Sequence, residues 1–158
     1  MKALSWLGHN PFVSSWPWRG SITTKLPARF ERQAQRVLGE ATPGEPAVFC
    51  RSTQQSFLRL ASTPTLLRAY GAEGLTNRDA LVALDALLAL PQVCERTEPP
   101  GVLALWHRLA CRDTASPKVW MDAYLGAFAI RGGLRMVSLD HDFKGLEAQG
   151  LDLVLLNP

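Results

Sequence analysis

Two aspartates in the last third of the sequence have the residue type and surroundings of metal ligands. Asp140 follows the apolar run "LRMVSL", and Asp122 lies on a predicted helix, on a stripe of small and apolar residues. An ionised carboxylate resists burial unless a partner or a metal compensates for the lost water. Two converging carboxylates would bind a hard divalent cation, Mg²⁺ or Mn²⁺, which can activate water and stabilise charge on a phosphodiester.

Both aspartates can also be explained by ordinary structural roles. Aspartate is common in the turn after a strand, which would explain Asp140, and Asp122 could face solvent at a helix boundary. Asp142 is better explained as the cap of the following turn than as a third ligand. At this point a metal site and unrelated surface carboxylates are both open.

Helices and short apolar strands alternate along the readable part of the chain. Helices are predicted over residues 28–40, 52–62, 76–91, 101–111 and 116–133, and strands over 47–50, within 92–100, 134–140 and 151–156. The last two strands hardly alternate between apolar and polar residues, as is typical of parallel strands covered on both faces. This order predicts an α/β layered fold with a mainly parallel sheet. Ligands of such sheets bind beyond the carboxyl ends of the strands, where Asp140 lies.

Signals at the helix ends define two of these helices further. Ser52 or Thr53 is expected to cap the helix of residues 52–62. The helix that carries Asp122 has Ser116 as its expected cap and Gly132 as its expected left-handed C-cap.

Length and composition limit the class of protein. The 158 residues, 47% of them hydrophobic, suit a single domain over 1–158, in which residues 1–28 are expected to be irregular. A net charge of +3 permits an anionic partner such as RNA without requiring one. Three cysteines without CxxC spacing argue against a disulfide framework and a structural zinc site. No apolar run is long enough to span a bilayer, so we expect a cytoplasmic protein.

Four segments resemble PIN-domain ribonucleases, and most closely the VapC-type toxins of bacterial toxin–antitoxin pairs. They are "FCRSTQQSFLRLAS", "SPKVWMDAYLGAFA", "LRMVSLDHDF" and "GLDLVLL", and they cover roughly residues 47–157. The resemblance implies a three-layer α/β/α PIN-like fold and an endoribonuclease that depends on Mg²⁺ or Mn²⁺. It also implies a cognate antitoxin that binds the toxin.

The resemblance also assigns site residues by motif. Asp122 resembles the helical acid of the family, and Asp140 resembles its strand-end acid. Thr53 and Gln54 fall where the family commonly has threonine followed by glutamate or glutamine. The expected catalytic set is therefore Asp122, Asp140, Gln54 and Thr53, with the two aspartates as metal ligands.

The sequence departs from the family pattern in two places. The first acid of the family ends a strand of the form hydrophobic-Asp-x-Asn, but no aspartate precedes Asp79 here. "ALSWLGH" at residues 3–9 resembles the segment after that strand, so the N-terminal strand is expected to be atypical or missing. Gln54 adds no charge, and fewer anionic ligands weaken a hard-cation site. The alternative function is a catalytically weakened PIN-like domain that binds RNA or protein without cutting.

Basic and aromatic side chains suggest two further surfaces. Lys118, which shares the stripe of Asp122, and Arg51 are the expected RNA-binding residues among the basic side chains. Tryptophans at positions 6, 16 and 18 could form an exposed patch for an antitoxin or a homodimer, although a core role is equally compatible.

Overall fold

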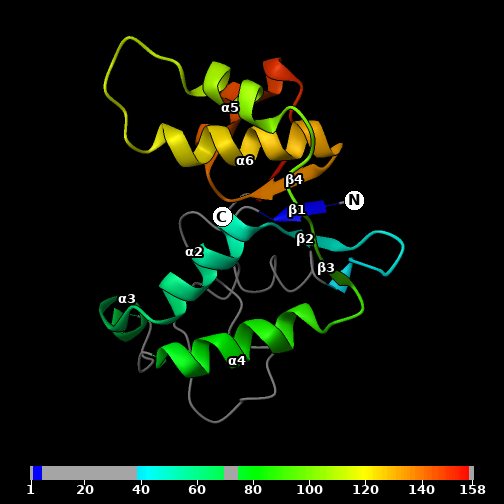
Figure 1. Cartoon of the computed structure of the whole chain (residues 1–158), viewed down its shortest axis with the longest axis vertical. Coiled ribbons are helices and arrows are strands. Elements are labelled where there is room, and N and C mark those ends of the chain that lie inside the picture. Colours follow the sequence, from blue (N-terminus) through cyan, green and yellow to red (C-terminus); the bar gives the residue numbers. More distant parts are fainter. Residues whose placement is uncertain (1, 5–38, 70–74, 157–158) are drawn as a thin grey trace.

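The fold is a five-stranded parallel sheet between two layers of helices (Figure 1). A computed structural model describes residues 2–4, 39–69 and 75–156. The strands are β1 (Lys2–Leu4), β2 (Ala47–Phe49), β3 (Val93–Glu95), β4 (Arg135–Ser138) and β5 (Asp152–Leu155), in the sheet order β3-β2-β1-β4-β5. Every neighbouring pair runs parallel. The predicted layered fold with a mainly parallel sheet is confirmed.

The strand β1 occupies the centre of the sheet. Lys2 is in register with Ala47 of β2 on one side and with Arg135 of β4 on the other. Of the two alternatives expected for the N-terminal strand, a missing strand is therefore wrong, whereas an atypical strand agrees with its three residues and its lack of an aspartate. Ala3 and Leu4 belong to β1 and not to the segment after it, and residues 5–9 lie outside the described part. Three residues suffice because neighbouring strands supply hydrogen-bonding partners on both sides. The rest of residues 1–28, and the predicted helix over 28–40 except its last two residues, lie outside the described part.

Helices cover both faces of the sheet (Figure 1). One layer holds α2 (Arg51–Ala61), α3 (Pro64–Ala69) and α4 (Asn77–Leu88), and the other holds α5 (Val102–Ala110), α6 (Val119–Gly132) and the 3₁₀ helix η1 (His141–Gln149). Among the helices of the described residues, none is long and apolar enough to cross a membrane.

The side chains of the strands alternate between two cores. Val48 and Met136 belong to the core that Phe128 of α6 fills, whereas Phe49 and Val137 belong to the core that contains Leu87 of α4. This is the two-residue periodicity of a strand buried on both faces, so neither face shows a polar stripe in the sequence.

The helix α2 begins earlier than the sequence predicted. Its N-cap is Cys50, and not Ser52 or Thr53. The Thr53 hydroxyl accepts a hydrogen bond from the Cys50 backbone N–H at 3.0 Å and donates one to the Cys50 carbonyl oxygen at 2.8 Å. Thr53 therefore stabilises the start of the helix from its first turn rather than from the cap position.

The helix α6 is shifted at both ends from the prediction. Lys118 is its N-cap, and Ser116 precedes the helix in a turn in which its carbonyl oxygen accepts a hydrogen bond from Val119 N–H at 3.1 Å. The left-handed residue at the other end is Gly133, with φ of 59°, rather than Gly132.

A glycine of α6 allows η1 to pack closely against the helix. A Cβ atom on Gly126 would overlap Cδ1 of Leu146 in η1. Since Asp140 directly precedes η1, this close packing holds the end of β4 and the start of η1 beside α6.

Candidate active site

The topology brings α2, α6 and the end of β4 to one edge of the sheet. Because the strands are parallel, the residues after β2 and β4 emerge at the same edge. The chain leaves α6 at the amino edge, where β4 begins, so the first turn of α6 lies at the carboxyl edge. A hydrogen bond of 2.9 Å from Ser52 Oγ to Met121 Sδ joins the starts of α2 and α6.

Asp122 is a buried carboxylate in the first turn of α6. The residue is 8% exposed, and Oδ1 of its side chain has no hydrogen-bond partner among the described residues. Desolvation raises the pKa of Asp122 above its ordinary value, although the charge of Lys118 acts in the opposite direction. A buried oxygen without a partner is costly, which makes it a candidate ligand for a cation.

Asp140 caps η1 at the end of β4. Its Oδ1 accepts a hydrogen bond from Asp142 N–H at 3.0 Å. The prediction that Asp142 is the cap of this segment is therefore wrong, because Asp140 caps it and Asp142 lies in its first turn. Desolvation alone would raise the pKa of Asp140, but the Asp142 N–H and the Lys118 ammonium outweigh it and hold that pKa below its ordinary value.

Lys118 bridges two carboxylates of the site. Its Nζ lies 3.0 Å from Asp140 Oδ2 and also forms an ion pair with Asp142 Oδ2. The hydrogen bond to Asp142, followed by that to Asp140, raises the pKa of Lys118. Lys118 was predicted to contact RNA, but here its charge is matched by acidic groups of the same chain.

Gln54 is the neutral polar side chain at the start of α2. It is 3% exposed, its Oε1 accepts a hydrogen bond of 3.1 Å from Arg51 Nη1, and its Nε2 has no partner within the described residues. Arg51 also forms an ion pair of 3.2 Å with Glu95. The hydroxyl of Thr53 is hydrogen-bonded to the backbone of Cys50, so Thr53 fixes the first turn of α2, which carries Gln54.

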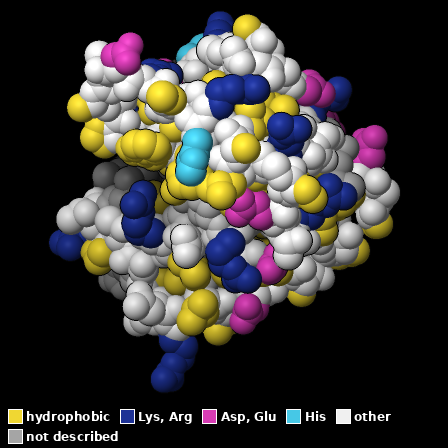
Figure 2. Space-filling view, turned by 45° about the horizontal axis from the view of Figure 1, so that its top comes forward, with side chains coloured by type: hydrophobic (Ala, Val, Ile, Leu, Met, Phe, Trp, Pro, Cys, Tyr) yellow, Lys and Arg dark blue, Asp and Glu magenta, His cyan; other side chains and the backbone are white. Residues whose placement is uncertain are grey.

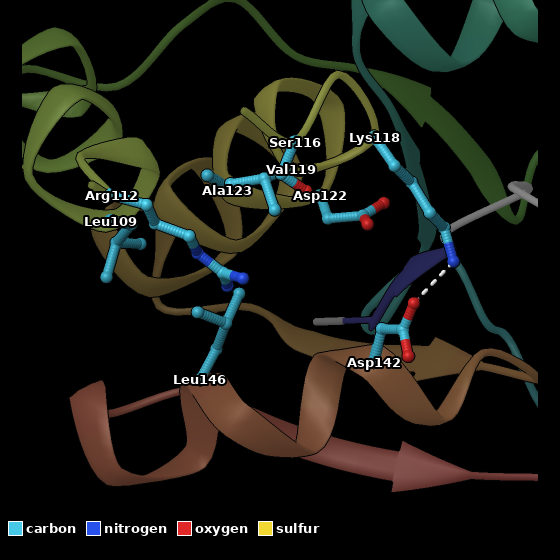
Figure 3. A pocket seen from close by; sticks show the side chains of 9 residues that line it. All are labelled: Leu109, Arg112, Ser116, Lys118, Val119, Asp122, Ala123, Asp142 and Leu146. Carbon is cyan, nitrogen blue, oxygen red and sulfur yellow. Dashed lines mark hydrogen bonds and ion pairs between the residues drawn. The ribbon is translucent and has the colours of Figure 1, made fainter. Parts of the chain in front are cut away.

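A pocket of about 280 Å³ adjoins Asp122 (Figure 3). It is lined by Leu109, Arg112, Ser116, Lys118, Val119, Asp122, Ala123, Asp142 and Leu146. Neither a site role for Arg112 nor the pocket was predicted, because no local sequence pattern places the end of α5 beside η1. The pocket becomes visible only when α5, α6 and η1, which are separate segments of the sequence, are seen packed together.

The basic side chains do not gather into a single patch on the face shown in Figure 2. On the described residues visible there, Lys and Arg side chains are spread among hydrophobic and acidic ones. This distribution agrees with the small net charge of +3. Contact with an anionic polymer would therefore depend on individual cations beside the site more than on a broad positive field.

The donor set suits a hard divalent cation with few protein ligands. No cluster of three or more His, Cys, Asp or Glu residues occurs in the described ranges. Mg²⁺ is often held by only one or two carboxylates, with water and substrate phosphate as its other ligands. Asp122, with its unpartnered Oδ1, and Asp140 fit that requirement once Lys118 has released Asp140.

Comparison with known proteins gives one relative, found in two strains. The chain is 48% identical over 109 residues to "Ribonuclease VapC41" of two strains of Mycobacterium tuberculosis. The matched region covers 68% of this chain and 73% of the relative. No family model matches the chain.

Proposed function

The chain belongs to the VapC family of PIN-domain ribonuclease toxins, and from this membership we propose that it hydrolyses RNA phosphodiesters with a divalent metal ion held by Asp122 and Asp140. The metal is Mg²⁺ or Mn²⁺, because both are bound through oxygen ligands. The family that the sequence resembled is thereby confirmed.

The unpartnered Oδ1 of Asp122 is the observation that carries the proposal. It is buried at the carboxyl edge of the sheet, where Asp140 and Gln54 also emerge. A bound divalent ion would supply activation of water and stabilisation of phosphate charge. Asp122 and Asp140 bind and orient it, and the free Nε2 donor of Gln54 positions a water or a phosphate oxygen.

Cleavage of single-stranded RNA in the presence of Mn²⁺ tests this function. We expect Asp140→Asn and Asp122→Asn, and equally a chelator, to abolish cleavage. Asp152→Asn is the matched control, because Asp152 is an exposed, ion-paired aspartate at the opposite edge of the sheet. Cleavage that survives both site variants and the chelator would refute the metal-dependent mechanism.

A weakened binding module is the second candidate, and one observation favours it. Lys118 already neutralises Asp140, and only two carboxylates are offered to a metal. In that case the wild-type chain binds RNA but leaves it intact at every Mn²⁺ concentration, and Asp140→Asn behaves like the wild type in both assays.

Family membership also supports proposals about partners and location. We propose that a cognate antitoxin binds the chain in the cytoplasm, and that two copies form a homodimer. Four large apolar side chains exposed on the helices offer contact area for such partners: Leu81, Val82, Leu103 and Trp120. Light scattering of the purified chain would distinguish a monomer from a dimer. Growth arrest on expression in a bacterial host, lost in Asp140→Asn, would support a toxin.

A further inference from the structure

The pocket beside Asp122 is built from three segments, and one of them, the end of α5, carries none of the proposed metal ligands. Arg112 follows the end of α5, Val119 begins α6, and Leu146 comes from η1. Figure 3 shows Arg112 on the side of α5 and Lys118 with Asp142 on the opposite side, with Asp122 between them. The pocket is therefore continuous with the proposed reaction site.

Two basic side chains line the pocket, and one of them is ion-paired with acidic groups whereas the other is not. Lys118 is paired with Asp142 and with Asp140. Arg112 is exposed, and it makes no ion pair or hydrogen bond with any residue that the structure describes. A guanidinium in this state keeps its planar set of donors for an external anion, and phosphate is the anion it binds best by two parallel hydrogen bonds.

The remaining wall is largely apolar. It consists of Leu109, Val119, Ala123 and Leu146, with the Ser116 hydroxyl as a further polar group. The volume of about 280 Å³ lies near the lower end of the range of small-molecule pockets, roughly 300–1,000 Å³. An apolar wall beside a free cation matches a single nucleotide, which offers a flat base and ribose next to a phosphate. A base becomes available in this way when RNA is single-stranded.

We propose that this pocket binds one nucleotide of single-stranded RNA adjacent to the scissile phosphate. Arg112 holds the phosphate of that nucleotide, and its base and ribose lie against Leu109, Val119 and Leu146. The inference rests on the proposed function, since it takes RNA as the substrate. It adds a binding subsite and makes Arg112 a residue that sets affinity for the substrate without touching the metal.

RNA binding without cleavage separates this subsite from the metal chemistry. The probe is a fluorescent, mixed-sequence single-stranded RNA, titrated in a chelator with the full-length chain. We expect Arg112→Ala to weaken binding about tenfold, as for the loss of one charge-assisted contact. The same variant should reduce the slope of log affinity against log salt by about 0.7, the value for one phosphate contact on a single strand.

Arg108→Ala is the matched control, because Arg108 is an exposed arginine of α5 that does not line the pocket. It removes the same charge, so a general electrostatic effect would weaken RNA binding equally in both variants. Val119→Phe, which fills the pocket without changing its charge, should also weaken binding. Circular dichroism checks that each variant is folded.

The outcomes distinguish this inference from the proposed function. Equal affinities of Arg112→Ala and Arg108→Ala, or a wild-type chain that does not bind the probe, would overturn the subsite whether or not RNA is cut. Weaker binding by Arg112→Ala together with no cleavage by the wild type would support the subsite and refute the nuclease. In an active enzyme, Arg112→Ala should raise KM.

Discussion

Replacement of Lys118 by methionine is predicted to tighten metal binding, although it removes a side chain from the site. The ammonium lies 3.0 Å from Asp140 Oδ2, so a metal ion can use this oxygen only after the ammonium leaves. Methionine keeps most of the aliphatic length and removes the charge. The variant therefore offers Asp140 and Asp142 to a cation without the competing ion pairs.

The size of the effect follows from the exposure of these pairs. The Lys118 side chain is 59% exposed, and the side chains of Asp140 and Asp142 are 17% and 62% exposed. Ion pairs in such surroundings contribute up to about 1 kcal/mol each, because water screens them. Breaking two of them before the metal binds costs about 0.4–2 kcal/mol, so Lys118→Met should bind Mn²⁺ about 2- to 30-fold more tightly than the wild type.

Isothermal titration calorimetry with Mn²⁺ on the full-length chain measures this change directly, without RNA. Arg135→Met is the matched control, since Arg135 forms a similarly exposed ion pair of 2.9 Å with Asp152 at the amino ends of β4 and β5. It should leave the affinity for Mn²⁺ unchanged. If Lys118→Met binds Mn²⁺ no more tightly than the wild type, then Lys118 does not compete with the metal and Asp140 is not a ligand as proposed.

Three further predictions concern residues in and around the candidate site. Asp122→Asn should raise the thermal midpoint of unfolding at pH 7 by a few degrees, because burial raises the pKa of Asp122 and ionisation of this carboxyl therefore destabilises the folded state. This gain in stability over the wild type should vanish as the pH falls below the ordinary aspartate pKa of about 4. Gly126→Ala should lower the free energy of unfolding by about 1–3 kcal/mol in urea titrations, because the new methyl group overlaps Leu146, whereas Gly145→Ala, with open space around it, should have little effect. Gln54→Glu adds an anionic ligand and should tighten Mn²⁺ binding about tenfold in calorimetry, and an unchanged affinity would mean that this side chain does not reach the ion.

The parallel sheet, and the position of Asp122 and Asp140 at one edge of it, could be predicted from local sequence. Asp140 follows an apolar run, and Asp122 lies in a helix that leads directly into that run, so the order of elements alone brings both to one edge. The strand β1 was not recognisable, because three residues carry no periodicity and its register depends on β2 and β4.

The pairing of Lys118 could not be predicted either. The sequence suggested a helix from Ser116, which would place Lys118 one turn before Asp122 on the same stripe. In the structure the helix starts at Val119, and Lys118 reaches residues 22 and 24 positions later in the chain. Contacts of this kind depend on how distant segments pack, and no local pattern encodes them.

The central place of β1 also determines when this protein can fold. Among the described strands, Lys2–Leu4 alone joins the pair β3-β2 to the pair β4-β5. One of the two neighbours of β1, the strand β4, is synthesised more than 130 positions after it. Such distant pairing slows folding, and the sheet cannot close until β4 has left the ribosome. Asp140 follows β4 directly, so the candidate active site can be assembled only after β4 has been synthesised and has paired with β1.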